Sequence, residues 1–228
     1  MKRKTLLALA GALLALLTAC SRSGNVYNVL DFGARGDGVT DDAAALQRTI
    51  DRCEQAGGGT VVLPAGRTFL SGPLELKGGI EYRLEPGSVL LANPDESIYH
   101  LSAFGKNEGE GMLWLYARDT RNITLCGSGT IDGNGVAFMG EELEDSYDLK
   151  PVTTFDPRPH VLTFYGVEGL RIRDLTIRNG AYWTVHLVGC RDALISGISL
   201  LNNLKIRNGD GIDIDHSRKV RISNCFIE

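Results

Sequence analysis

The stretch Leu170-Arg-Ile-Arg-Asp-Leu-Thr-Ile177 recurs as Ala193-Leu-Ile-Ser-Gly-Ile-Ser-Leu200 and again as Val220-Arg-Ile-Ser-Asn-Cys-Phe-Ile227. The copies start 23 and then 27 residues apart. Each copy has apolar residues at alternate positions on either side of a bend, which is typical of two short β-strands. Because so small a unit cannot bury its own apolar face, successive copies must stack. The repeat therefore predicts an all-β fold, a right-handed parallel β-helix with one coil per roughly 20 to 30 residues.

Further copies precede this stretch. A weaker one, Ile123-Thr-Leu125 with Gly129-Thr-Ile131, lies 47 residues before the first copy. We expect one additional, irregular coil between the two, carrying an insertion near residues 136–157. Alternating apolar residues predict the strands of the first coils, at 59–63, 68–70, 74–76, 80–84 and 89–91. The alternative, a β-sandwich of antiparallel hairpins, would need two-residue turns at shorter spacing.

The beginning of the fold departs from the repeat. Alternation predicts a strand at 26–30, followed by a turn rich in Gly and Asp. A helix should then begin with Thr40 as its N-cap and end at the glycines 57–59. One face of that helix carries an apolar stripe formed by Leu46, Ile50 and Cys53. We interpret it as a capping helix, because the open end of a stack of strands has to be covered.

The first residues have the pattern of an export signal. Basic residues at 2–4 precede the apolar run 6–17, which is too short to span a bilayer. The run ends in Leu-Thr-Ala-Cys20 and resembles a bacterial lipoprotein signal, in which Cys20 becomes the lipidated N-terminus. We therefore expect a signal peptide at 1–19, a tether at 20–25 and a β-helix domain at 26–228, exported and anchored in the cell envelope. The alternative is an ordinary secretory signal cleaved near Ala19.

Composition excludes several classes of protein. Of the 228 residues, 43% are hydrophobic and 23% charged, which excludes a disordered chain. The 28 glycines argue against a helical bundle, because Gly destabilises helix interiors. A net charge of −4 lacks the basic excess of a nucleic-acid-binding protein. No close Cys pair or zinc-like His spacing occurs, so we expect no metal. The remaining cysteines could be paired or buried as free thiols: Cys53, Cys126, Cys190 and Cys225.

The densest group of acidic residues is Asn208-Gly-Asp-Gly-Ile-Asp-Ile-Asp-His216, between the strands of two coils. Asp210 lies between two glycines, which permit unusual backbone angles. Asp213 and Asp215 alternate along the next strand and therefore share one face. Stacked coils would turn such positions into a row of groups along an open groove, and acid/base cleavage of a polymer needs carboxylates held at fixed separation. The same letters are also an ordinary turn signal, and a calcium loop is a further alternative.

Five segments together resemble the polygalacturonases, glycoside hydrolase family 28. They are Val29–Asp42, Gly57–Gly66, Gly127–Gly135, Arg158-Pro-His with Tyr182-Trp-Thr-Val-His186, and Asn208-Gly-Asp-Gly-Ile-Asp213. The last resembles the family signature Asn-Thr-Asp-Gly, whose Asp helps to activate the attacking water in an inverting mechanism. The resemblance thus implies hydrolysis of α-1,4-galacturonosyl linkages in pectin with Asp210 as a catalytic base, and it implies no metal or organic cofactor. Gly209 departs from the usual Thr.

Other parts of the family pattern are absent from the 228 residues: an adjacent Asp-Asp pair in the next coil, a later Gly-His-Gly and an Arg-x-Lys that binds the substrate carboxylate. The chain stops at Cys225-Phe-Ile-Glu228, within a strand pair. We therefore expect a chain truncated at its C-terminal side. Such a fragment should hydrolyse nothing efficiently by itself, because one carboxylate cannot act as both acid and base in one displacement.

Several other residues are candidates for substrate binding or support. His186 and Asn208 are assigned a supporting role by the resemblance, although His186 could equally be a structural histidine. Lys205 and Arg207 could attract a polyanionic sugar, or simply be solvated. We expect a pectic polysaccharide or oligogalacturonide as partner, the membrane through Cys20, no nucleic acid, and a monomer. A polysaccharide lyase of the pectate-lyase type and a non-catalytic carbohydrate-binding β-helix remain as alternatives.

Overall fold

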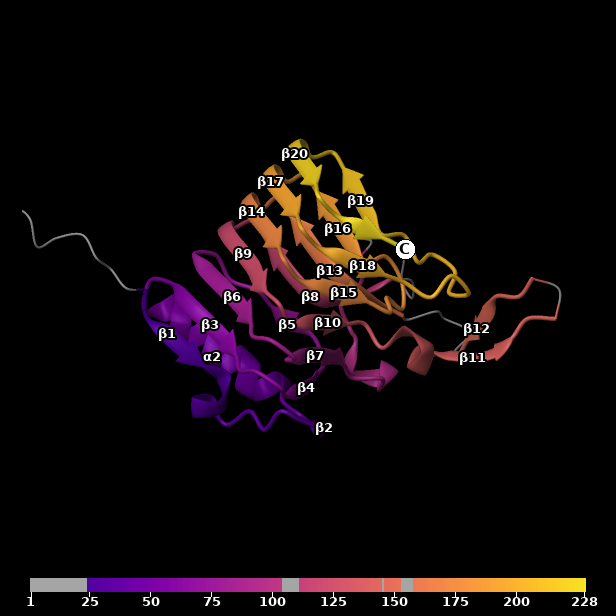
Figure 1. The fold of residues 1–228 in the computed structure, drawn as a ribbon, viewed down its shortest axis with the longest axis horizontal. Coiled ribbons are helices and arrows are strands. Elements are labelled where there is room, and N and C mark those ends of the chain that lie inside the picture. Colours follow the sequence, from indigo (N-terminus) through magenta and orange to yellow (C-terminus); the bar gives the residue numbers. More distant parts are fainter. Residues whose placement is uncertain (1–23, 104–110, 145, 153–157) are drawn as a thin grey trace, which may run out of the picture.

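The computed structural model describes residues 24–103, 111–144, 146–152 and 158–228, so the predicted signal lies outside the described residues. Three parallel sheets wind into a β-helix (Figure 1). Sheet A contains β1 (Val26–Asn28), β3 (Gly59–Leu63), β6 (Ile80–Leu84), β9 (Arg121–Gly127), β14 (Glu168–Arg173), β17 (Arg191–Ser196) and β20 (Arg218–Ser223). Sheet B contains β2 (Asp37–Asp41), β4 (Thr68–Ser71), β7 (Val89–Ala92), β10 (Thr130–Asp132), β15 (Thr176–Arg178), β18 (Ser199–Leu201) and β21 (Phe226–Ile227). Sheet C contains β5 (Leu74–Glu75), β8 (Met112–Arg118), β13 (Pro159–Tyr165), β16 (Val185–Val188) and β19 (Ile212–Asp215).

Equivalent residues of the sequence repeat are pairing partners in neighbouring coils. Leu170 pairs with Ala193 and Ala193 with Val220 in sheet A, and Ile177 pairs with Leu200 in sheet B. The alternate residues point inward and form one continuous core. The parallel β-helix is confirmed, and two of the predicted strands, 59–63 and 80–84, have the observed bounds of β3 and β6.

The predicted additional coil is wrong. Strand β9 pairs directly with β14, with Ile123 opposite Leu170, and β10 pairs directly with β15. The 47 residues between the two copies are therefore a single coil with a long insertion between β10 and β13. Part of that insertion folds as an antiparallel hairpin of β11 (Met139–Glu142) and β12 (Leu149–Pro151), preceded by the 3-10 helix η3 (Gly135–Phe138). Figure 1 shows the hairpin projecting from the body of the stack.

Left-handed residues stack where the chain turns from sheet C into sheet A. Tyr165, Val188 and Asp215 are register partners, and the residue after each has a positive φ: 58° at Gly166, 62° at Gly189 and 48° at His216. Asp119, at the same corner after β8, has a φ of 45°, so four successive coils share this conformation. Glycine adopts it without steric cost, whereas a residue with a Cβ rarely does. Successive coils thus turn from sheet C into sheet A with the same backbone conformation.

The N-terminal helix differs in detail from the prediction. Helix α2 spans Ala43–Gln55, and Thr40 lies in strand β2 instead of capping it. Asp42 occupies the N-cap but bonds away from the helix: its carboxylate accepts from the backbone N–H groups of Arg35 and Gly36, at 2.7 and 2.9 Å. The predicted strand at 26–30 is also shorter. It stops at Asn28, whose side chain accepts from the N–H of Leu30 and starts the 3-10 helix η1 (Val29–Phe32).

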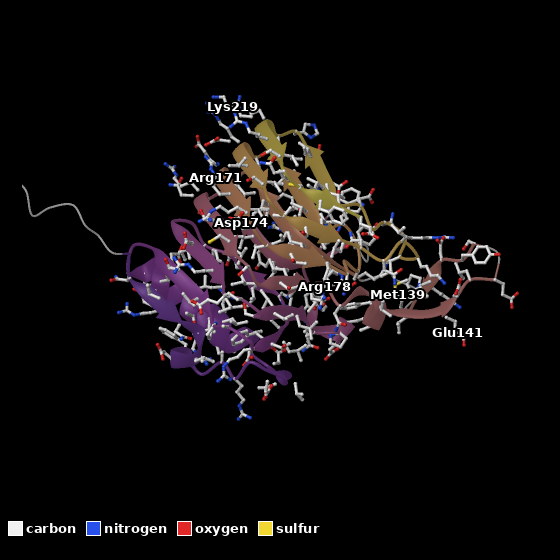
Figure 2. All side chains as sticks on the ribbon, in the orientation of Figure 1. Met139, Glu141, Arg171, Asp174, Arg178 and Lys219 are labelled. Atoms are coloured by element: carbon white, nitrogen blue, oxygen red, sulfur yellow. The ribbon has the colours of Figure 1, made fainter. Side chains whose placement is uncertain are left out.

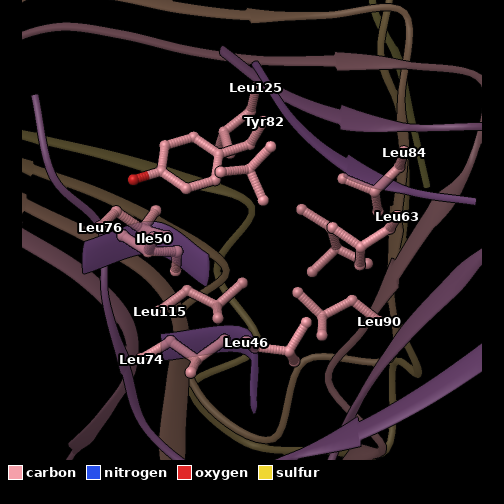
Figure 3. Close-up of a pocket in the computed structure, with 12 residues that line it drawn as sticks. Leu46, Ile50, Leu63, Leu74, Leu76, Tyr82, Leu84, Leu90, Leu115 and Leu125 are labelled. Carbon is pink, nitrogen blue, oxygen red and sulfur yellow. The ribbon is translucent and has the colours of Figure 1, made fainter. Parts of the chain in front are cut away.

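Helix α2 covers the end of the core, as the amphipathic stripe predicted. Its buried side chains include Leu46 and Ile50, which face leucines and a tyrosine from all three sheets (Figure 3). A void of about 20 Å³ remains between them, lined by apolar atoms. The N-terminal end of the stack is therefore closed by the chain's own helix.

Two other expectations concern the cysteines and the relation of the chain to a membrane. All four cysteines outside the signal, at positions 53, 126, 190 and 225, are free thiols, and three of them are buried. In the part of the chain that the structure describes, no helix is long and apolar enough to cross a membrane. A short 3-10 helix, η2 (Glu96–Ile98), completes the described helices.

Candidate active site

The segment that holds Asp210 connects β18 to β19 and ends on the edge of sheet C. The carbonyl of Asp210 accepts from the N–H of Thr184 at 2.8 Å, and that of Gly211 from Val185 at 3.0 Å. The Asp210 side chain is exposed. Neither flanking glycine has a positive φ, so the predicted unusual angles are not at the glycines; Asn208, with φ of 57°, turns the chain instead. Asp210 thus lies two residues before β19 and is hydrogen-bonded to the preceding coil.

Asn202 fixes the inner side of this segment. Its amide nitrogen donates to the carbonyl of Gly209 at 3.0 Å and to the hydroxyl of Thr184 at 2.6 Å, while its side-chain oxygen accepts from the N–H of Gly180 at 3.0 Å. One side chain therefore ties the Asp210 segment to two neighbouring parts of the coil below.

Arg158 holds the outer side. It is only 1% exposed, and its guanidinium donates to the carbonyls of Ala181 at 3.0 Å and Arg207 at 2.9 Å, and to the side-chain oxygen of Asn208 at 3.4 Å. The same group lies 4.9 Å from the centre of the Tyr182 ring. The guanidinium group is planar and always charged, and its several N–H donors can bind carbonyls in different directions at once. The compact ammonium group of a lysine could not reach all of them. Arg158 is thus built into the support of the segment that ends at Asp210.

A second carboxylate lies next to Asp210. Asp213 points outward from β19 and is the register partner of His186 on β16. Burial, and then the charge of Asp210, raise the pKa of Asp213 to about 6. Its Oδ2 is buried without a hydrogen-bond partner among the described residues. Asp215, two residues on, is exposed and contacts His216.

Aromatic rings and imidazoles form the wall beside these carboxylates. His160 stacks on Tyr182 with ring centres 5.0 Å apart, and Trp183 meets His186 edge-on at 4.9 Å. Burial, and then the nearby His186, lower the pKa of His160 to about 3. Burial also lowers the pKa of His186, against the opposing effect of Asp215. The two imidazoles are therefore neutral at neutral pH, and His186 lies opposite Asp213 in the register of sheet C.

The two predicted substrate-attracting cations are engaged elsewhere. The Lys205 ammonium lies 2.7 Å from a carboxylate oxygen of Glu142, and Nε of Arg207 lies 2.6 Å from one of Asp148. The N–H of Leu149 also donates to the carbonyl of Lys205 at 2.8 Å. These contacts dock the β11–β12 hairpin on the segment before Asp210. Figure 2 shows the hairpin, with Met139 and Glu141 labelled, apart from the charged side chains of sheet A.

No metal centre is visible in this arrangement. Within residues 24–103, 111–144, 146–152 and 158–228, no group of three or more His, Cys, Asp or Glu side chains is placed to hold an ion.

Comparison with known proteins identifies the family. The sequence profile of glycosyl hydrolases family 28 matches residues 53–228. The chain belongs to this family. It is 28% identical to a polygalacturonase of Persea americana over 88% of this chain and 41% of the relative, and 28% identical to an exopolygalacturonase of Zea mays over 91% and 48%. The family 28 exopolygalacturonase structure of Yersinia enterocolitica superposes with a TM-score of 0.77 at 25% identity, covering 91% of this chain and 44% of that one.

These relatives are longer than the chain described. The chain spans less than half the length of several curated relatives that it matches. Family 28 membership and the β-helix are properties of this chain.

As a family 28 site, the arrangement offers two carboxylates in different surroundings. The exposed Asp210 can accept a proton from a water molecule. Burial raises the pKa of Asp213 to about 6, so this carboxyl retains its proton to a higher pH than an ordinary aspartic acid. The neutral His186 is the register partner of Asp213 on the preceding coil.

Sequence reasoning missed Arg158 as a support and gave Asp213 no role of its own. The alternation of Asp213 with two isoleucines does place it on the outward face, and that signal was available. Arg158 is 50 residues from Asn208, and only the stacking of the coils brings the two side chains together. No local pattern carries that information.

Proposed function

We propose that the protein to which this chain belongs is a polygalacturonase-type hydrolase, which cleaves α-1,4-galacturonosyl linkages of pectic polysaccharide with inversion of configuration. Asp210 acts as a base that activates the attacking water. The observation that carries this proposal is the exposed Asp210 carboxylate, held at the edge of sheet C by Arg158 and Asn202 beside Asp213. The family match and the polygalacturonase relatives support the substrate class.

Inversion sets the requirements of the site. Water attacks the sugar carbon from the face opposite the leaving oxygen, so the base must lie away from the acid with room for the water between them. The exposed carboxylate of Asp210, two residues before β19, leaves that room on its solvent side. Asn208 and His186 support the site by position, and the enzyme works as a monomer, because one chain forms the continuous core of the stack.

The test compares two carboxylates on the same strand edge. Reducing ends released from polygalacturonate are measured for the product of the complete reading frame, for Asp210→Asn and for the control Asp215→Asn. Loss of a positioned base lowers the rate by about a hundredfold or more, so Asp210→Asn should be nearly inactive, with the control close to wild type. No release by the wild type, or undiminished release by Asp210→Asn, would overturn the proposal.

We also propose that the protein is exported and held in the cell envelope by a lipid on Cys20. The basic start, the apolar run and Leu-Thr-Ala-Cys20 support this. Labelling cells with a radioactive fatty acid should mark the wild type but not Cys20→Ala. An unlabelled wild type would leave the ordinary secretory signal as the explanation.

A further inference from the structure

The outer face of the last coils of sheet A is basic, although the chain as a whole carries −4. We call it the basic face, and it is separate from the Asp210 site, which lies on sheet C. Its outward or flanking charged side chains on β9, β14, β17 and β20 comprise seven cations and three anions: Arg121, Arg171, Arg173, Arg191, Arg218, Lys219 and Arg221, with Glu168, Asp174 and Asp192. Positive charge is therefore concentrated here against the sign of the chain. Arg171, Asp174 and Lys219 are labelled along this face in Figure 2.

The register brings like charges together. Arg191 and Arg218 are direct partners in neighbouring coils, so their backbones lie about 4.8 Å apart. Arg171 and Arg221 share one row, separated by Leu194 and thus by roughly 10 Å. Like charges directly opposite each other destabilise a sheet. Glu168 is the register partner of Arg191 on its other side and offsets part of this repulsion, and an anionic partner would offset the rest.

Only part of this charge is neutralised within the chain. Arg171 pairs with Asp192 at 2.9 Å, and Arg173 pairs with Asp174 at 3.1 Å. Five cations form no ion pair with any described residue: Arg121, Arg191, Arg218, Lys219 and Arg221. All five are exposed, and the last four belong to the same two coils as His186 and Asp213. The unneutralised charge thus lies at the level of the candidate site but on another sheet.

The face is also hollowed at this level. Arg171, Asp192, Leu194, Lys219 and Arg221 border a depression of about 350 Å³. That volume falls within the range of about 300–1,000 Å³ found for small-ligand sites. The depression is bordered by donors that can each bind a carboxylate, the arginines by two parallel hydrogen bonds.

We propose that the basic face is a second binding surface for a carboxylate-bearing polysaccharide chain, separate from the Asp210 site. The inference rests on the proposed function in one respect: the pectic substrate is such a polyanion. A polymer with a carboxylate on each sugar can engage several rows of cations at once, whereas the rest of this acidic chain repels it. The described strands β14, β17 and β20 contain no aromatic residue that could stack on the bases of a single-stranded nucleic acid. The surface holds the polymer and performs no chemistry.

The experiment measures binding of polygalacturonate at low ionic strength by titration calorimetry, in the Asp210→Asn background so that no substrate is consumed. The variant Lys219→Glu/Arg221→Glu should bind at least about tenfold more weakly, because two charge-assisted contacts become repulsive. The matched control, Arg35→Glu/Arg67→Glu, changes the net charge equally at exposed positions of the N-terminal coils and should bind like the parent. Salt should weaken parent binding.

A milder variant, Lys219→Asn/Arg221→Gln, keeps the proposal testable if charge reversal perturbs folding, and its binding should be intermediate. Equal binding by the parent and both basic-face variants would overturn the proposal. So would equal affinity for fully methyl-esterified polymer, or binding only of DNA or anionic lipid vesicles. The hydrolase proposal is tested separately, by measuring the reducing ends that the protein with an intact basic face releases from polygalacturonate.

Discussion

At the scale of single residues, the support of Asp210 depends on a buried guanidinium. Arg158 donates to two backbone carbonyls, those of Ala181 and Arg207. Arg158→Met should lower the free energy of unfolding by about 2–3 kcal/mol, because it leaves these acceptors buried without donors. Arg158→Lys should recover part of the loss, since an ammonium reaches fewer acceptors.

Urea denaturation checks this prediction, with Arg52→Met on the exposed side of α2 as the control. Equal stability of Arg158→Met and the control would show that the guanidinium does not support the segment.

Asp213 makes the stability of the folded protein depend on pH. Its carboxyl has a pKa of about 6 in the folded protein against 3.8 in the unfolded chain, so the folded state binds more protons between these values. Stability should therefore fall as pH rises through this window, and the loss is complete above about pH 6. The free energy of unfolding of Asp213→Asn, relative to that of the wild type, should therefore rise by about 1 kcal/mol between about pH 4 and pH 7. The change is this small because solvent partly screens the half-exposed carboxyl. A difference between the two proteins that stays constant with pH would contradict this assignment.

The residue scale also shows where sequence stops being informative. The position of Asp210 followed from a local pattern of nine residues, and its exposure agrees with that pattern. The pairing of Lys205 with Glu142 joins residues 63 positions apart, across an insertion whose conformation no periodicity describes. Side chains assigned to substrate from local charge alone were therefore found in contact with the hairpin.

At the scale of elements, α2 closes the core through two large side chains. Leu46→Ala should lower the free energy of unfolding by about 3 kcal/mol, because it enlarges an existing void that its leucine neighbours cannot fill. Glu54→Ala, on the exposed side of the same helix, should change it by less than about 0.5 kcal/mol. Thermal unfolding of both variants tests the prediction. A small loss in Leu46→Ala would mean that the helix is dispensable for closing the stack.

The sequence predicts a helix or strand correctly where a short run of neighbouring residues carries its periodicity. Strands β3 and β6 could be bounded because alternation and glycines mark them directly. The helix start was misplaced because Asp42 bonds to the turn at Arg35 and Gly36 instead of capping its own helix. The number of coils was misjudged because a 47-residue spacing fits one interrupted coil as well as two regular ones, and only the pairing of β9 with β14 decides.

At the scale of the whole molecule, charge is divided between faces. The acidic chain keeps carboxylates on sheet C at the candidate site and an excess of cations on the outer face of sheet A. A stack of coils allows this division because each sheet is a separate flat side of the same solenoid (Figure 1). Under the two proposals made above, a polyanionic substrate is held on one side and cleaved on another.

The measurement that tests the central claim most directly is a proton NMR time course of polygalacturonate with the product of the complete reading frame. An inverting hydrolase converts an α-linkage into a β-configured reducing end, which should appear first and only later equilibrate with the α form. The same signals should be absent with Asp210→Asn. An α reducing end appearing first, an unsaturated sugar typical of a lyase, or no product at all would contradict the account.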